Sequence, residues 1–217
     1  MAKGRQPILA REGWVHIAVS GAAALALHYF AGWMWALPLW LILIFVIQFF
    51  RDPPRKIPAA PLGIVCPADG RVIAVGDAHD PYLDRPAKRV SIFMNVFDAH
   101  ANRSPTEGKI KERWYQAGRF FNATLDKASF ENERNALWIQ TDEGDDLVVV
   151  QVAGLIARRI LCDKQPGERI AQGERYGFIR FGSRVDTYIP ASSQVKVTLG
   201  DRVKAGSDII GFLVHGV

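Results

Sequence analysis

A long stretch without any charged side chain constrains this sequence most. From Gly13 to Phe50 there is no Asp, Glu, Lys or Arg, whereas charged residues are frequent after Arg51. The stretch is roughly twice the ~20 residues that cross a bilayer once, and Pro38 near its middle predicts a break into two helices. The sequence therefore predicts an N-terminal hydrophobic helical hairpin, whose second half, Leu39 to Phe50, is short enough to be re-entrant or interfacial.

Basic residues flank the apolar stretch on both sides: Lys3, Arg5 and Arg11 before it, and Arg51, Arg55 and Lys56 after it. The positive-inside tendency places both flanks in the cytoplasm, which requires an even number of crossings or none. A cleavable signal peptide is the alternative, but the apolar run is too long and no small-x-small site precedes a plausible mature start. We therefore expect residues 1–56 to be a membrane-associating segment and linker at the cytoplasmic face of the cell membrane.

The charge of the chain indicates an anionic partner. The formal net charge is +5 and the pI is about 9.4, which suits either nucleic acid or acidic lipid headgroups. With the hairpin beside it, the lipid surface is the expected partner, and no nucleic acid is expected. Cys66 and Cys162 are far apart and lack any metal-ligand spacing, so we expect buried thiols in a reducing cytosol, with no metal site and no disulfide.

Residues 57–217 read as a second domain that is mainly β. Short runs rich in β-branched residues are bounded by Gly, Pro or Asp, and no amphipathic helical repeat of ten residues stands out. We expect a compact β-barrel or sandwich. The predicted strands are Ile64–Cys66, Arg71–Val75, Arg89–Met94, Lys109–Tyr115, Ala136–Gln140, Leu147–Ile156, Tyr176–Phe181, Gln194–Thr198 and Ile209–Leu213.

The C-terminal segment Val195 to Phe212 alternates apolar and polar residues around two Gly-containing turns. It resembles the β-hammerhead repeat of lipoyl and biotinyl carrier domains. The modifiable lysine that such carriers place at a hairpin tip is missing here. The resemblance therefore implies a lipoyl-like shape rather than a carrier function.

The dipeptide Gly182-Ser183 stands out by its context. A Gly-Ser pair usually marks a flexible turn, but this one interrupts strand-like runs at Tyr176 to Phe181 and Val185 to Ile189, where glycine weakens the strand and calls for a local reason. Glycine permits positive φ and a close approach. Both are needed if the Ser183 hydroxyl is to attack the Gly182 carbonyl.

Several further segments share one resemblance, which extends over most of residues 60 to 215. Together with the segment around Ser183, they resemble the processing, loop and histidine motifs of phosphatidylserine decarboxylases of the short form. The matching segments are Phe181-Gly182-Ser183-Arg184-Val185-Asp186, Pro67-Ala68-Asp69-Gly70, Asn95 to Pro105, Gly118 to Ala123, Leu125 to Ser129 and Glu131 to Asn135.

The resemblance implies a self-cleaving proenzyme. Ser183 Oγ attacks the Gly182 carbonyl, the peptide bond becomes an ester, and β-elimination followed by hydrolysis leaves a pyruvoyl group in place of Ser183. Residues 1–182 then form a β chain and residues 183–217 an α chain, associated as a heterodimer; a higher oligomer is left open. The pyruvoyl ketone condenses with the amine of phosphatidylserine and accepts the electrons released with CO₂, which yields phosphatidylethanolamine.

The resemblance also implies an Asp-His-Ser arrangement for self-cleavage, formed here by Asp69, His100 and Ser183. Longer members of the family carry two histidines three positions apart in this motif, and the second position here is Arg103. Either His100 serves both processing and decarboxylation, or Arg103 binds a carboxylate or phosphate of the substrate with its forked donors.

Two other classes of function remain open at this point. One is a non-catalytic, membrane-tethered hammerhead module, and the other is a pyruvoyl-dependent decarboxylase of another amino-bearing substrate. Glu131 and Glu133 are either a helix-facing charge cluster or part of the substrate pocket. A set of basic residues is expected to attract anionic headgroups: Arg51, Arg55, Lys56, Arg113 and Arg119.

Overall fold

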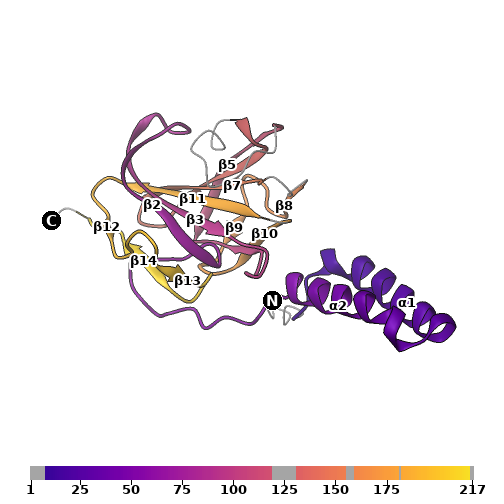
Figure 1. Ribbon diagram of the computed structural model, residues 1–217. Coiled ribbons are helices and arrows are strands. Elements are labelled where there is room, and N and C mark those ends of the chain that lie inside the picture. Colours follow the sequence, from indigo (N-terminus) through magenta and orange to yellow (C-terminus); the bar gives the residue numbers. More distant parts are fainter. Residues whose placement is uncertain (1–7, 119–130, 155–158, 181, 216–217) are drawn as a thin grey trace. The chain divides into compact units, whose positions relative to one another are not determined.

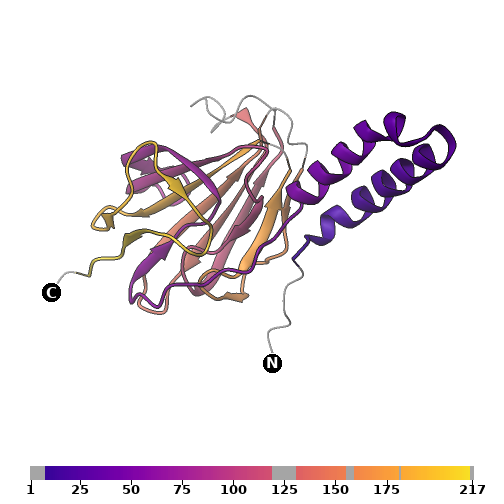
Figure 2. The same cartoon turned by 60° about the horizontal axis from the view of Figure 1, so that its bottom comes forward.

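The computed structural model describes residues 8–118, 131–154, 159–180 and 182–215. The chain divides into two compact units, Met1–Pro54 and Arg55–Val217, which are drawn in Figures 1 and 2. Arg119, Phe181, the segment from Phe120 to Ser129 and the end of the strand predicted at Leu147–Ile156 fall outside the described residues.

The first unit is a helical hairpin. A short 3-10 helix η1 (Arg11–Gly13) leads into α1 (Trp14–Ala31), and α2 (Trp33–Phe49) returns beside it. Backbone hydrogen bonds close the open end, from Ala10 N to Phe50 O at 2.8 Å and from Asp52 N to Ile8 O at 2.6 Å. The two flanks of the hairpin therefore lie at the same end of this unit, as the sequence predicts.

The break between the helices lies at Gly32, so its prediction at Pro38 is wrong. Gly32 has φ of +86°, a left-handed value that favours glycine, and its N–H donates to His28 O at 3.0 Å. Pro38 instead lies inside α2. It sits in the second turn of that helix, where its missing N–H costs one intrahelical hydrogen bond.

The helices expose their apolar side chains. Tyr29 and Phe30, for example, are each 83% exposed. Among the described residues, the helix Arg11–Ala31 is long and apolar enough to cross a membrane, while Trp33–Phe49 is shorter. At 1.5 Å per residue, α2 still extends for about 26 Å, close to the thickness of a bilayer core.

The second unit is mainly β, as predicted. Its strands are β1 (Gly63–Val65), β2 (Gly70–Asp80), β3 (Arg85–Met94), β4 (Ala101–Arg103), β5 (Gly108–Gln116), β6 (Arg134–Gln140), β7 (Asp146–Val152), β8 (Ile160–Cys162), β9 (Arg169–Ile170), β10 (Arg175–Ile179), β11 (Ser183–Pro190), β12 (Gln194–Val195), β13 (Arg202–Val203) and β14 (Ile209–Phe212).

These strands form one large sheet and two small ones. The large sheet is antiparallel and strongly curled, a half-barrel with the order β13-β2-β3-β11-β7-β6-β5-β9. The small sheets have the orders β1-β14-β12 and β4-β10-β8. Every predicted strand overlaps one of these elements, but the short strands β4, β8, β9 and β13 were not predicted, because they hold too few residues to show a pattern.

Both faces of the large sheet carry apolar side chains. In β7, Leu147 and Val149 belong to the main hydrophobic core, while Val148, Val150 and Val152 belong to a second cluster on the opposite face. Successive side chains of a strand point to opposite faces, so the continuous apolar run in β7 reflects burial on both sides.

The two cysteines are free thiols in the β unit. Cys66 is fully buried and donates to Ala68 O at 2.9 Å, and burial raises the pKa of its thiol. Cys162 is only partly buried, and burial raises its pKa as well. No group of three His, Cys, Asp or Glu side chains suited to a metal ion occurs in the part of the chain that the structure describes.

Cys66 is therefore expected to resist alkylation in the folded protein. The thiolate is the reactive form, and Cys66 combines a raised pKa with complete burial. Iodoacetamide at mildly alkaline pH, followed by peptide mass mapping, should label Cys162 first and Cys66 only after denaturation. Equal labelling of both thiols in folded protein would contradict this burial.

Candidate active site at Gly182 and Ser183

Ser183 lies where the chain passes from one sheet to another. β10 belongs to the small sheet and ends at Ile179, and Ser183 begins β11 in the large sheet, opposite Met94 of β3. Gly182 adopts φ of +59°. A Cβ there would meet nothing within 4 Å, so glycine is favoured by backbone conformation rather than by lack of space.

The Ser183 side chain is buried against a sulfur atom. It is fully inaccessible to solvent, and its Oγ lies 3.5 Å from Met94 Sδ. Asn102 Nδ2 contacts the same sulfur at 3.7 Å. Because a thioether is a weak acceptor, the hydroxyl is held in place without a strong partner for its proton among the residues that the structure describes.

His100 is buried in the loop that follows β3. Its Nδ1 lies 2.9 Å from Asp98 O. A carbonyl can only accept, so Nδ1 carries the hydrogen, and in the neutral imidazole Nε2 is the nitrogen with a free electron pair. The backbone oxygen of His100 also accepts from Ile179 N at 3.3 Å. The histidine loop is thus tied to the end of β10, just before Gly182.

Asp69 immediately precedes β2 at the same end of the large sheet. A Cβ at Gly70 would lie 2.1 Å from Phe93 O, and Phe93 pairs with Arg184 of β11. The Asp69 carboxylate accepts from Arg55 NH2 at 2.6 Å and from Ala205 N at 2.7 Å. The structure therefore places Asp69 near the strand ends that carry Ser183, in a buried ion pair with Arg55.

Arg103 is the last residue of β4 and is also buried. Its NH1 donates to Gly173 O at 3.2 Å, and its backbone N donates to Pro67 O at 2.9 Å. Its Cδ packs near Gly206, where a Cβ would come within 2.9 Å. The backbone bond to Pro67 links the histidine segment to the Asp69 loop.

Two residues near Ser183 were not predicted as site residues. Asn102 lies inside the histidine segment, so its place in that motif could have singled it out. Met94 gave no signal, because an apolar residue at the end of a strand is normally read as core. Arg113, expected at a lipid-facing surface, instead donates through Nε to Asn135 Oδ1 at 2.8 Å.

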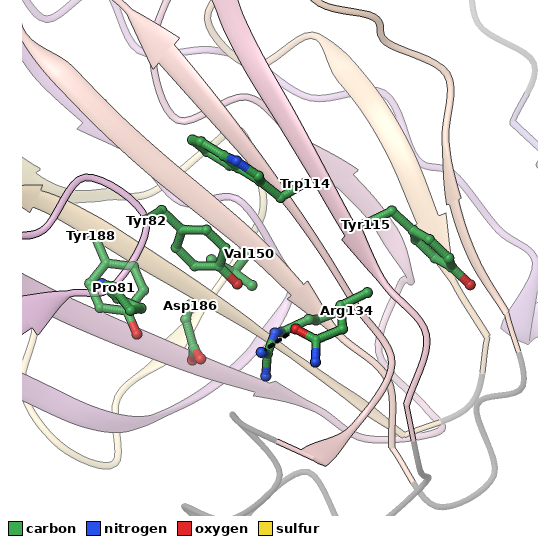
Figure 3. A pocket seen from close by; sticks show the side chains of 9 residues that line it. Pro81, Tyr82, Trp114, Tyr115, Arg134, Val150, Asp186 and Tyr188 are labelled. Carbon is green, nitrogen blue, oxygen red and sulfur yellow. Dashed lines mark hydrogen bonds between the residues drawn. The ribbon is translucent and has the colours of Figure 1, made fainter.

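A cavity of about 440 Å³ lies on the other face of the large sheet (Figure 3). Asp186 and Tyr188 of β11 line it. Val185 belongs to the main core instead, as does Met94, the residue that Ser183 Oγ contacts. Burial raises the pKa of Tyr82, in the same cavity, to about 12. Alternation along β11 thus separates this cavity from the Ser183 side chain.

Glu131 and Glu133, expected as a helix-facing charge cluster or as part of the substrate pocket, differ in burial. Glu131 is exposed, whereas Glu133 is buried and accepts from Tyr115 OH at 3.1 Å and Ile160 N at 3.3 Å. Neither lines the cavity of Figure 3. Glu133 therefore joins β5, β6 and β8, which is a structural contact.

A mainly β domain with a buried serine directly after a glycine of positive φ has the features of a pyruvoyl-dependent proenzyme. Comparison with known proteins narrows this class. The phosphatidylserine decarboxylase family model matches residues 42–211. The phosphatidylserine decarboxylase proenzyme of Nitrosomonas europaea is 58% identical over 204 residues, 94% of each chain.

Two further proenzymes of the same name are similarly close. That of Aromatoleum aromaticum is 59% identical over 207 residues, 95% of this chain and 96% of its own. That of Burkholderia pseudomallei is 55% identical over 207 residues, with the same coverage. The chain belongs to the phosphatidylserine decarboxylase family, as its motifs indicated, and is thus a pyruvoyl-dependent carboxy-lyase made as a proenzyme.

Proposed function

We propose that this chain cuts itself between Gly182 and Ser183 and then converts phosphatidylserine to phosphatidylethanolamine and CO₂ at the cytoplasmic face of the cell membrane. The observation that carries the proposal is the fully buried Ser183 directly after Gly182 with φ of +59°. Family membership supplies the reaction and the substrate, and the residues below are our assignment.

In the proposed self-cleavage, His100 Nε2 takes the proton of Ser183 Oγ, which attacks the Gly182 carbonyl carbon. The carbon–nitrogen bond breaks as the Ser183 nitrogen takes up this proton from His100, and Gly182 becomes an ester of Ser183. Loss of the Ser183 Cα proton then breaks the Cβ–Oγ bond, which releases residues 1–182 with a Gly182 carboxylate. Hydrolysis of the dehydroalanine that remains releases ammonia and leaves the pyruvoyl group.

The surroundings of Ser183 fit a small ketone. The side chain is fully buried against Met94, which belongs to the main hydrophobic core. When formed, the pyruvoyl group supplies the electron sink that loss of CO₂ requires. We assign His100 to proton transfer in both processing and decarboxylation, and Arg103 to binding a phosphate or carboxylate of the substrate.

Asp69 is proposed as the third member of the cleavage arrangement. Its carboxylate would stabilise the His100 imidazolium by charge, once the ion pair with Arg55 opens. Asp69→Asn should therefore slow the appearance of the two chains on a denaturing gel by at least about tenfold, as expected for a group that supports a general base.

Arg55→Gln is the matched control for Asp69, because it removes the other partner of the same ion pair. Cleavage at or above the unaltered rate in this variant, with slow cleavage in Asp69→Asn, supports the assignment. Equal slowing in both variants would mean that the Arg55–Asp69 ion pair only holds the segment before β2 in place. That result would contradict a role of Asp69 in cleavage.

The two chains are expected to stay together after cleavage. β11, from residues 183–217, lies between β3 and β7, which belong to residues 1–182. β14 likewise pairs with β1. We propose that the lipoyl-like hammerhead formed by residues 195–212 serves this association rather than a carrier function, and that residues 57–217 form the catalytic domain.

The hairpin is proposed as the membrane anchor within residues 1–56. Its apolar, exposed helices would hold the reactive site at the bilayer, where the substrate lies. A chain that lacks residues 1–54 but keeps Arg55 should no longer sediment with vesicles, and its CO₂ release from phosphatidylserine vesicles should fall by at least about tenfold, because one apolar anchor contributes several kcal/mol.

The control for the shortened chain is its turnover of a short-chain, water-soluble phosphatidylserine, which should match that of the full chain. Vesicle binding retained without the hairpin would contradict its role as the anchor. Loss of turnover toward the soluble substrate would show that the hairpin acts in the chemistry as well.

The substrate assignment is tested by supplying phosphatidylserine in micelles and free serine to the same preparation and measuring CO₂. Release from the lipid alone is expected. Equal release from both, or release from serine alone, would favour a pyruvoyl enzyme for another amine. A chain that stays uncleaved and releases no CO₂ would favour the non-catalytic module.

A further inference from the structure

Three buried amide side chains lie in line between Arg113 and the main core. Asn135 of β6, Gln151 of β7 and Asn102 of β4 are all inaccessible to solvent, and we call them the amide chain. Asn135 Nδ2 donates to Gln151 Oε1 at 3.0 Å, and Gln151 Nε2 donates to Asn102 Oδ1 at 2.8 Å. Buried amides are costly unless they are satisfied, and here each one satisfies the next.

The amide chain ends at the sulfur atom that the reacting serine also contacts. Asn102 Nδ2 contacts Met94 Sδ at 3.7 Å, and Ser183 Oγ contacts the same sulfur at 3.5 Å. Because the thioether is a weak acceptor, it leaves the donor capacity of Asn102 largely unused.

Arg113 fixes the direction of the chain. An amide can present either its oxygen or its nitrogen to a neighbour, whereas a guanidinium only donates. Arg113 Nε donates to Asn135 Oδ1 at 2.8 Å, so Asn135 must turn Nδ2 toward Gln151. The same constraint passes through Gln151, so Asn102 presents N–H groups, and not its oxygen, to the sulfur beside Ser183.

The backbone leaves room for this arrangement. A Cβ at Gly177 of β10 would lie 2.7 Å from Gln151 Nε2 and 2.3 Å from Leu161 O. Both distances are shorter than packed side chains tolerate, so only glycine lets β10 pass over the middle of the amide chain.

We propose that the amide chain positions Asn102 as a hydrogen-bond donor to the oxygen of Ser183 that departs during self-cleavage. The inference rests on the proposed function, in which Ser183 is the nucleophile. After the ester has formed, a base removes the Ser183 Cα proton, and its electron pair forms the Cα–Cβ double bond. The Cβ–Oγ bond breaks, and Oγ leaves with the bonding electrons as a carboxylate oxygen of Gly182.

Negative charge grows on Oγ in this step, and a donor oriented in advance stabilises it without reorganisation. Polarisation along the hydrogen bonds from Arg113 strengthens the terminal donor. Asn102 thus acts after the ester has formed, whereas His100 acts on the Ser183 hydroxyl before it.

Asn135→Asp tests the direction of the chain at a distance from Ser183. The carboxylate keeps the shape of asparagine and the acceptor for Arg113, but it cannot donate to Gln151. Gln151 must then turn its Nε2 toward the new carboxylate, which leaves Gln151 Oε1 facing Asn102. Asn102 must turn its Nδ2 toward that oxygen, so that its own Oδ1, and no longer an N–H, faces Ser183 Oγ. The matched control is Gln116→Glu, since Gln116 Oε1 accepts from Arg134 outside the amide chain.

Asn135→Asp should lower the rate of chain separation at least about a hundredfold, the smaller end of the effect of losing an oxyanion donor, while Gln116→Glu should cleave as the unaltered chain does. Hydroxylamine attacks the ester carbonyl of Gly182, forming a hydroxamate and freeing Ser183. Its addition should restore separation in Asn135→Asp, because the ester accumulates. An unchanged rate, or slowing that hydroxylamine does not relieve, would overturn the proposal.

Folding is followed by the thermal midpoint of each variant in a Ser183→Ala background, where no cleavage interferes. If Asn135→Asp shows no cooperative transition, Asn102→Asp makes the same change at the Ser183 end and is scored by the same rates and the same hydroxylamine addition. If the unaltered chain does not cleave before Ser183, the proposed function itself is contradicted, whatever the variants show.

Discussion

Ser183→Ala is expected to leave the chain as a single uncleaved band of 24.1 kDa with no decarboxylase activity. The variant lacks the oxygen that forms the ester and the leaving group that creates the double bond, so neither step of pyruvoyl formation can begin. The expected loss is complete rather than graded. A denaturing gel together with CO₂ release from phosphatidylserine micelles measures both effects.

The fold of this variant should be intact. Within the described part of the chain, Ser183 Oγ makes a weak contact to Met94 Sδ, and replacement by alanine removes no strong hydrogen bond there. Ser91→Ala is the matched control, because Ser91 is a buried serine of β3, the strand that pairs with β11. Cleavage in Ser183→Ala, or its loss in Ser91→Ala, would contradict the assignment of the nucleophile.

His100→Ala is expected to produce the second largest effect. Loss of a positioned general base lowers a rate by about 10² to 10⁴, so the chain should accumulate uncleaved over times in which the unaltered chain is fully processed. The hydrogen bond of Nδ1 to Asp98 O leaves Nε2 as the basic nitrogen, which is the form needed to take the Ser183 proton.

His79→Ala is the control for this experiment. His79 is exposed and pairs with Asp84 in the turn between β2 and β3, so its loss should not affect cleavage. CO₂ release per cleaved molecule then separates the two assigned roles. Residual cleaved His100→Ala that turns over normally would restrict the histidine to processing, whereas normal cleavage would refute its role there.

Several features could be predicted because they depend on local sequence. The uncharged stretch from Gly13 to Phe50 specified a helical hairpin, since its composition suits the bilayer core over its whole length. The β-branched run from Leu147 predicted the strand that is β7. The glycine before Ser183 permits a positive φ, and Gly182 adopts one.

Other features depend on contacts between distant residues and could not be predicted. Arg55 and Arg113 look like surface charges in the sequence, yet they pair with Asp69 and Asn135 inside the β unit. Met94 is an ordinary core residue until β3 pairs with β11 and sets it against Ser183. The helices turn at Gly32, which adopts a positive φ, and not at Pro38. Pro38 does not end α2, because proline is tolerated in an early turn of a helix.

The small chain offers the most direct measurement of the central claim. Intact mass spectrometry of freshly purified protein should detect two chains, one ending at Gly182 and one consisting of residues 183–217. The smaller chain should be lighter, by one ammonia, than a chain that begins with serine, and borohydride should add hydrogen to its ketone. A single full-length mass, or a small chain that begins with an unmodified Ser183, would contradict the account.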